Sequence, residues 1–406
     1  MNKIRGKIAV YLLFLMLFFY PVVAAFSLLF NLNNQSISIV VRGIFTIVSI
    51  LLIFMAILSK EKLKFNKLGL ILFISFTFYT GRVLYDIFLK GLIFGDNLFY
   101  ILSFLLGACF LPFIAVILSA RCININDNWG FFYNLSFFSN LCLFIIVFSF
   151  SRQEIASLLV GRFNSIEIIN PVSISLYGEI LFIFSFFNLS FQSSMPKRVV
   201  YLLGLFMGLF FLFLGASRGP FLSTVSIIIF FLLKYNFRKI GIGLSVLKLV
   251  FFLIVGSFLL YFASMNFEIA MFERISFFAD NLEEIQDDER LILWKGALHQ
   301  FVSSPILGDS YLESTTKFFP HNIFVEILMS TGIFGGILFL TATMLTFQFF
   351  IKSHVNNNDN NTQLYLSSLF LIFFISLFFS GGLFLSFELW ITWALITIIY
   401  KPSGIR

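Results

Sequence analysis

Apolar residues occur along this chain in long runs, and polar residues gather in the segments between the runs. The runs repeat at roughly 20 residues, the length that an α-helix needs to cross a bilayer. About twelve such spans are predicted, near residues 8–30, 38–59, 68–89, 98–120, 131–150, 171–191, 199–215, 219–234, 244–264, 322–351, 364–382 and 385–400. The pattern therefore predicts an all-α integral membrane protein that crosses the bilayer many times.

Composition supports a membrane protein and excludes a water-soluble one. Of 406 residues, 59% are hydrophobic and 12% are charged, against about 45–50% and about 25% in soluble domains. The three cysteines, Cys109, Cys122 and Cys142, lie in or beside apolar segments and have no metal-like spacing. We therefore expect them to be small buried side chains.

The basic residues divide unevenly between the two sides of the membrane. If the N-terminus lies inside, the inner segments carry 17 of the 27 basic residues but only 3 of the 20 acids. Lys and Arg accumulate in cytoplasmic loops, so both termini are expected in the cytoplasm. The net charge of +7 then needs no nucleic-acid partner.

The polar segments predict one membrane domain over residues 1–406, with no separate soluble domain or internal repeat. Two outer segments are longer than a turn, 151–170 and 265–321. The second is the long outer loop. Arg290, Trp294 and Ala297 recur there at helical spacing, so a short helix is expected within it. Residues 352–363 form a polar cytoplasmic linker.

Arg218 lies in LGASRGPFLS, a tight outer turn between two apolar runs. Its guanidinium either reaches the lipid headgroups or serves a site at the outer face. Arg162, in the outer segment before Asn170-Pro171, offers the same chemistry. A proline at the first helical position is compatible with a span that starts at Pro171.

Charged residues inside predicted spans are costly and therefore informative. Arg82 and Asp86 stand four residues apart in one span, and Glu179 lies two turns into another. Arg82 and Asp86 either form a local ion pair, or Arg82 and Glu179 line a water-filled cavity. The pattern leaves both alternatives open.

His321 follows Pro320 and precedes a predicted span, at its outer end. Proline disfavours helix for the residue before it, and Asn322 is a good helix cap. A helix N-terminus attracts anions and disfavours a charged imidazole, so we expect a neutral His321, the form that a general base needs. The alternative is an interfacial histidine without a chemical role.

Acidic residues cluster at Asp287, Asp288 and Glu289. They either bind a divalent cation or remain solvated. The solvated alternative is favoured because the cluster lies in a loop, and no metal is predicted. Arginines that grip a diphosphate and a histidine that accepts a proton would together suit transfer from a lipid-linked diphosphate to a hydroxyl.

These residues also carry a family resemblance. The blocks are Ser217-Arg218-Gly219; Arg290, Trp294, Ala297 and Leu298 followed by SPILGDS; Pro320-His321-Asn322 with Glu326 and, further on, Gly332; and a weaker Gly161-Arg162 with Asn170-Pro171. Their order and the long loop before the P-H-N block resemble the O-antigen polymerase and O-antigen ligase superfamily, the Wzy and WaaL group. The motifs cover about residues 160–340.

The resemblance implies a glycosyltransferase-type (GT-C-like) membrane bundle in the bacterial inner membrane, with its active site at the periplasmic face and the long loop on that side. By position in the motifs, His321 would be the general base. Arg218, Arg290 and Arg162 would bind the donor diphosphate, and Arg82, Glu179, Asn322 and Glu326 are candidates for supporting roles. No cofactor or metal is implied.

The implied donor and acceptor are oligosaccharides linked to undecaprenyl diphosphate. Polymerase activity, which extends a lipid-linked repeat unit, is favoured because the S-R-G-P turn is more similar to polymerases. The alternative is a ligase that transfers the glycan to lipid A–core, and a less favoured one is a flippase for lipid-linked oligosaccharides. A chain-length regulator is a further partner that the resemblance leaves open.

Overall fold

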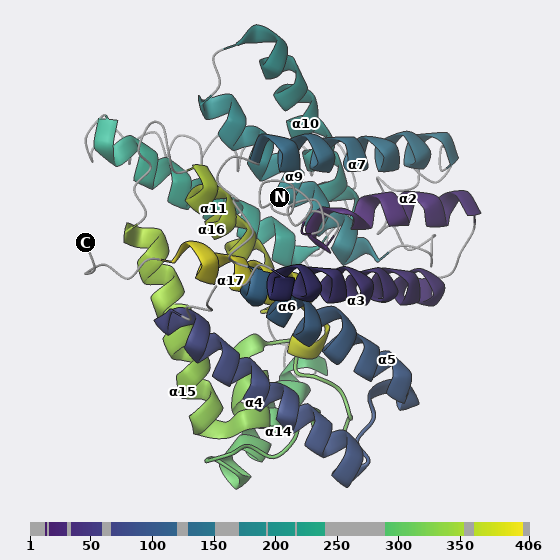
Figure 1. Cartoon of the computed structure of the whole chain (residues 1–406), viewed down its shortest axis with the longest axis vertical. Helices are drawn as coiled ribbons and strands as arrows, with labels where there is room; N and C mark the ends of the chain where they lie inside the picture. Colours follow the sequence, from purple (N-terminus) through teal and green to yellow (C-terminus); the bar gives the residue numbers. More distant parts are fainter. Residues whose placement is uncertain are drawn as a thin grey trace, which may run out of the picture. The chain divides into compact units, whose positions relative to one another are not determined.

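The computed structural model describes residues 13, 16–30, 34–58, 66–119, 129–150, 170–191, 194–215, 217–239, 289–352 and 361–400. Within these ranges the ordered elements are helices (Figure 1). Seven are long and apolar enough to span a membrane, and three shorter apolar helices accompany them. The protein is an all-α integral membrane protein. The predicted span at 244–264 lies outside the described residues.

The chain divides into two compact units. The first contains the helices α3 (Asn34–Leu58), from Ser38 on, α4 (Lys67–Lys90), η1 (Phe94–Asp96), α5 (Leu98–Leu102), η2 (Ser103–Phe110), α6 (Leu111–Ser119), α14 (Glu289–Ser303), α15 (Ile323–Lys352), α16 (Asn361–Ser376), η4 (Leu383–Leu385) and α17 (Phe387–Ile399). The second contains α2 (Tyr20–Phe30), α9 (Pro171–Phe191), α10 (Met195–Leu214), α11 (Arg218–Lys239) and, from Gly130 on, α7 (Trp129–Phe150).

Prolines interrupt two of the predicted spans. The run at 8–30 is not one continuous helix, because the helical backbone stops at Phe19, two residues before Pro21. In the run at 98–120, the stretch before Pro112 is a π-helix, in which Leu111 donates to the carbonyl of Leu106. Proline lacks the N–H that would continue the ladder, and a π-helical stretch is one way to absorb that loss.

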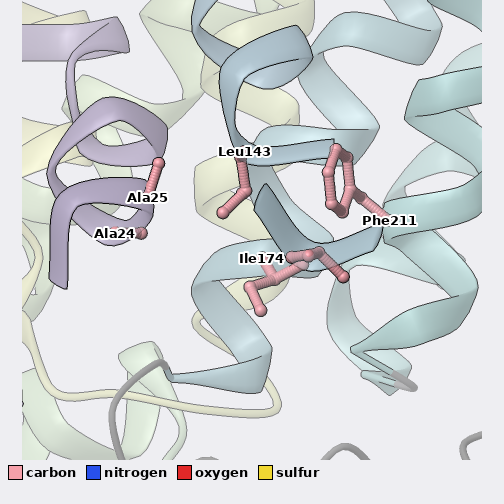
Figure 2. Close-up of a cluster of buried hydrophobic side chains, with 6 residues drawn as sticks. Ala24, Ala25, Leu143, Ile174 and Phe211 are labelled. Carbon is pink, nitrogen blue, oxygen red and sulfur yellow. The ribbon is translucent and has the colours of Figure 1, made fainter. Parts of the chain in front are cut away.

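In the second unit, α9 and α10 approach closely through glycines. A Cβ added to Gly208 would lie 2.7 Å from the carbonyl oxygen of Gly178, and one on Gly178 would lie 2.8 Å from that of Gly208. Small residues permit such contact between membrane helices. Beside this contact, Ala24, Ala25, Leu143, Ile174 and Phe211 belong to a buried apolar cluster (Figure 2).

In the first unit, α15 packs against α4 and α14 (Figure 1). α15 is broken at Gly332, which has φ +64° and ψ −161°. No described residue from Ile323 to Gly332 is exposed, whereas Ile333, Phe334 and Ile337 are. The break therefore separates a first segment surrounded by protein from a second whose apolar face points outward, as a lipid-facing helix requires.

A glycine is needed at this break for two reasons. The left-handed φ strains any other residue, and a Cβ on Gly332 would lie 2.5 Å from the carbonyl group of Ile306. The loop after α14 fills the break: Ile333 donates to the carbonyl of Pro305 at 2.8 Å, and Asp309 donates to the carbonyl of Met329 at 2.9 Å. The loop thus supplies partners to both broken ends of the helix.

Candidate active site at the start of helix α15

α15 begins immediately after the P-H-N block. The side-chain oxygen of Asn322 accepts from the N–H groups of Phe324 at 3.1 Å and Val325 at 3.3 Å, and its carbonyl accepts from Glu326 at 2.9 Å. These bonds satisfy N–H groups that a helix start leaves without partners. Asn322 is the cap, and His321 lies one residue outside the helix.

His321 is half-buried and has an unusual backbone. Its φ is +52°, in the left-handed region that non-glycine residues rarely adopt. Its ring lies 4.6 Å from that of Phe319 and 5.4 Å from that of Phe318, between centroids. Among the described residues its buried Nδ1 has no hydrogen-bond partner, and the backbone of Gly381 is a hydrogen-bond partner of the imidazole that raises its pKa.

The environment lowers the pKa of His321 to about 4. Burial is the larger cause, the positive charge of Arg290 adds to it, and the bond with Gly381 opposes both. The imidazole is therefore neutral at pH 7. A neutral His321 was predicted from the sequence because the residue precedes a helix N-terminus. In the structure, the causes of the low pKa are desolvation and the charge of Arg290.

α14 brings Arg290 and Trp294 to this place. The two lie one helical turn apart, and the Trp294 indole N–H donates to the carbonyl of Pro320 at 2.7 Å. Ala297, one turn further on, is fully buried. The spacing R-x-x-x-W-x-x-A therefore marks the face of α14 that packs inward. Sequence reasoning found this spacing but not the partner of Trp294.

The loop between α14 and α15 is held by two buried polar side chains. Gln300 donates to Asp309 at 2.9 Å and accepts from the Ser314 N–H at 2.8 Å. The carboxylate of Glu313 accepts from the backbone N–H groups of Thr315 at 3.0 Å and Thr316 at 2.7 Å. Burial works to raise the pKa of Glu313, but these donors outweigh it and lower the pKa. The loop that leads to His321 is thus an ordered structure.

Arg82 pairs with Asp86 in α4, at 3.0 Å and 3.1 Å. Asp86 is fully buried and also accepts from the Tyr311 N–H at 2.9 Å. Lys90, one turn on, donates to the backbone carbonyl of Asp309 at 2.6 Å and to its carboxylate Oδ1 at 3.0 Å. The local ion pair therefore exists, and it attaches the loop to α4. The i, i+4 spacing of Arg82 and Asp86 predicted the ion pair, but not its contact with the loop.

Glu326 lies one turn into α15 and is fully buried. Its carboxylate accepts from the hydroxyl of Tyr79 in α4 at 2.5 Å and from the N–H of Leu383, at the start of η4, at 3.0 Å and 3.1 Å. It therefore joins three segments that are far apart in sequence. Neither Tyr79 nor Leu383 was a sequence candidate.

The other candidate residues lie in the second unit or outside the described residues. Arg218 is half-buried and is the first residue of α11. Glu179 is fully buried in α9 and accepts from the hydroxyl of Ser223 at 2.5 Å. The cavity predicted from Arg82 and Glu179 involves both units and stays a prediction. Arg162 lies outside the described residues, as do Asp287 and Asp288.

The chain is a polytopic helical membrane protein in which the helix α14 and the ordered loop after it place an arginine and a neutral histidine near the start of α15. Residues 203–340 match the family model described as O-antigen ligase. Over these residues the resemblance to the O-antigen polymerase and ligase superfamily is therefore confirmed. The match contains all three main motif blocks but not Arg162, Arg82 or Glu179. No curated protein and no solved structure matched the chain.

This match supports a function within the O-antigen polymerase and ligase family, carried out by a membrane glycosyltransferase-like enzyme. The family implies lipid-linked polysaccharide substrates and contact with membrane lipids.

Proposed function

We propose that this protein is a surface-polysaccharide polymerase. It transfers a glycan from undecaprenyl diphosphate onto a second lipid-linked repeat unit, at the periplasmic face of the bacterial inner membrane, without metal or cofactor. Both termini lie in the cytoplasm, and the spans form a GT-C-like bundle. The observation that carries the proposal is the neutral His321, whose Nδ1 has no hydrogen-bond partner among the described residues and whose pKa is lowered by the charge of Arg290.

The chemistry follows from these groups. Nδ1 of His321 accepts the proton of the acceptor hydroxyl as its oxygen bonds to the anomeric carbon of the donor glycan. The bond from that carbon to the diphosphate oxygen breaks, and undecaprenyl diphosphate leaves with the electron pair. Arg290, together with Arg218 and Arg162, stabilises the negative charge that grows on the departing diphosphate.

The arrangement also links donor binding to base strength. The charge of Arg290 contributes to holding the pKa of His321 at about 4 in the free protein. A diphosphate bound to Arg290 would offset that charge and raise the pKa of His321 toward its ordinary value. A general base works best when its pKa approaches the operating pH, so the histidine would gain basicity when the donor is in place.

A ligase is the second candidate, because the matching family model is described as O-antigen ligase. It would use the same donor chemistry and deliver the glycan to lipid A–core. The polymerase is preferred because the turn Ser217-Arg218-Gly219-Pro220 is more similar to that of polymerases. The acceptor therefore distinguishes the two.

The test is glycan transfer by the purified protein in liposomes. Lipid-linked repeat units are supplied alone, then with lipid A–core as a competing acceptor, and the products are separated by gel electrophoresis. We expect a ladder of longer lipid-linked glycans that persists with a chelator. Label on lipid A–core alone would establish the ligase. Units that cross the bilayer without ever lengthening would establish transport and refute the enzyme.

A further inference from the structure

Trp294 holds the residue that precedes His321. Its indole N–H donates to the carbonyl of Pro320 at 2.7 Å, across 26 positions of sequence. That carbonyl belongs to the peptide group whose nitrogen is the backbone nitrogen of His321. A peptide group is planar. A hydrogen bond to its oxygen therefore restricts the orientation of the whole group, including the backbone nitrogen of His321.

The backbone of His321 needs such restraint. A non-glycine residue with φ +52° is in a sparsely populated conformation that persists only when its surroundings impose it. On its C-terminal side, Asn322 is fixed as the cap of α15. On its N-terminal side, the bond from Trp294 is the contact with Pro320 that fixes the chain. The two restraints together fix the position of the His321 Cα, from which the side chain extends.

We infer that Trp294 is a positioning residue for His321: its hydrogen bond to the Pro320 carbonyl stabilises the left-handed backbone that directs Nδ1 to the substrate. The inference rests on the proposed function. It gives a reason for the four-residue spacing of Arg290 and Trp294 in α14. Arg290 and Trp294 lie one helical turn apart in α14. The same helix therefore positions both the charge that lowers the pKa of His321 and the hydrogen bond that restrains its backbone.

A second tryptophan in the same unit provides a matched control. The indole N–H of Trp393, in α17, donates to the hydroxyl of Thr346, also at 2.7 Å. Trp393 is fully buried, and its bond lies among membrane helices rather than at the P-H-N block. Replacing either tryptophan by phenylalanine removes one indole hydrogen bond and keeps an aromatic ring. A purely structural role for Trp294 would make the two variants alike.

The first measurement is steady-state transfer by Trp294→Phe and Trp393→Phe in liposomes, with unfolding temperatures measured on the same preparations. We expect Trp294→Phe to lower kcat by about 10- to 100-fold, the effect of a small displacement of a catalytic group, and to change KM by less than about twofold. Trp393→Phe should match its loss of thermal stability but keep kcat within about twofold. Equal kcat values in the two variants would overturn the inference.

The second measurement does not depend on activity. Diethyl pyrocarbonate modifies neutral imidazoles, and peptide mass spectrometry separates His321 from His299 and His354. Once its backbone is released, His321 should be modified about fivefold faster in Trp294→Phe, the factor that one hydrogen bond of about 1 kcal/mol represents. The rate in Trp393→Phe should equal the wild-type rate, and His299 provides an internal reference in α14.

The two measurements separate the inference from the proposed function. If His321→Ala retains transfer while Trp294→Phe still accelerates modification of His321, the general base is wrong and the positioning contact stands. If His321→Ala is inactive while Trp294→Phe matches Trp393→Phe in both kcat and modification rate, the general base stands and the positioning role fails.

Discussion

His321 and Glu326 belong to one sequence block, five residues apart, yet their surroundings are opposite. His321 is half-buried and has a nitrogen with no partner among the described residues. Glu326 is fully buried, and both of its oxygens accept hydrogen bonds, from Tyr79 and Leu383. The Nδ1 atom of His321 can still accept a hydrogen bond from a ligand, whereas the carboxylate oxygens of Glu326 already accept hydrogen bonds within the fold.

This difference shows that a motif can combine chemistry and architecture. A buried polar atom without a hydrogen-bond partner needs an explanation, and a bound ligand is one. A satisfied buried carboxylate requires none beyond its partners, which here come from α4 and from the start of η4. We therefore distinguish two roles in the block: Glu326 joins the segments that support the helix start, and His321 is the proposed general base.

The largest expected effect is on the His321 side of the comparison. Replacing His321 with Ala should lower kcat by about 10²- to 10⁴-fold, the usual contribution of a general base. The variant also loses the hydrogen bond with Gly381 and places alanine at a left-handed φ, so the unfolding temperature should fall as well. The measurement is glycan extension in liposomes, together with thermal unfolding of the purified variant.

His321→Asn serves as a control for the backbone, because asparagine tolerates the left-handed conformation. It should be more stable than His321→Ala and equally inactive. Wild-type polymer length in both variants would show that His321 has no catalytic role.

Glu326 should show the converse behaviour. Glu326→Ala leaves the Tyr79 hydroxyl and the Leu383 N–H without their partner, and each buried orphan costs about 1–3 kcal/mol. We expect a free energy of unfolding lower by roughly 3 kcal/mol, measured by denaturation in detergent. Glu326→Gln retains an acceptor for Leu383 and should lose less. A Glu326→Ala protein with wild-type stability and no activity would instead make Glu326 part of the catalytic machinery.

The smallest effect is a shift in pH dependence. The imidazole must be neutral to act as a base, so activity falls as pH drops through its pKa, about 4 in the free protein. Arg290→Gln removes the second cause of that low pKa and leaves burial, the first. The pKa should rise but stay below 6.5, and the acid limb of kcat/KM should move to higher pH.

The measurement is kcat/KM from pH 4 to 7, with Lys295→Gln as the control, since Lys295 is also a cation of α14 but is not among the causes that lower the pKa of His321. An acid limb that moves equally in both variants would remove Arg290 from the account of the His321 pKa.

Several elements could be predicted from local sequence. The apolar runs gave the helices, because a span must be about 20 residues long whatever it packs against. Asn322 was foreseeable as a cap, since capping uses N–H groups two and three residues away. The i, i+4 spacing of Arg82 and Asp86 allowed the ion pair that the structure contains.

Other features depended on partners distant in the chain. At the break at Gly332, the carbonyl groups of Pro305 and Ile306 accept hydrogen bonds from the N–H groups of the second helical segment. The sequence around Gly332 does not indicate these partners. The environment of His321 needs Trp294 and Gly381, which reach it from α14 and from the turn before η4. Hydrophobic periodicity cannot predict such contacts, because it indicates only which face of a helix is apolar.

By itself, then, the sequence determined that this protein is a helical membrane protein and that its P-H-N block opens a helix, because hydrophobic length and capping are local properties. Only the tertiary structure decided that both carboxylate oxygens of Glu326 accept hydrogen bonds while Nδ1 of His321 has no partner in the described part of the chain, because hydrogen bonding depends on which segments meet. The same reason places the causes of the His321 pKa in burial and in Arg290, two properties that exist only once the chain has folded.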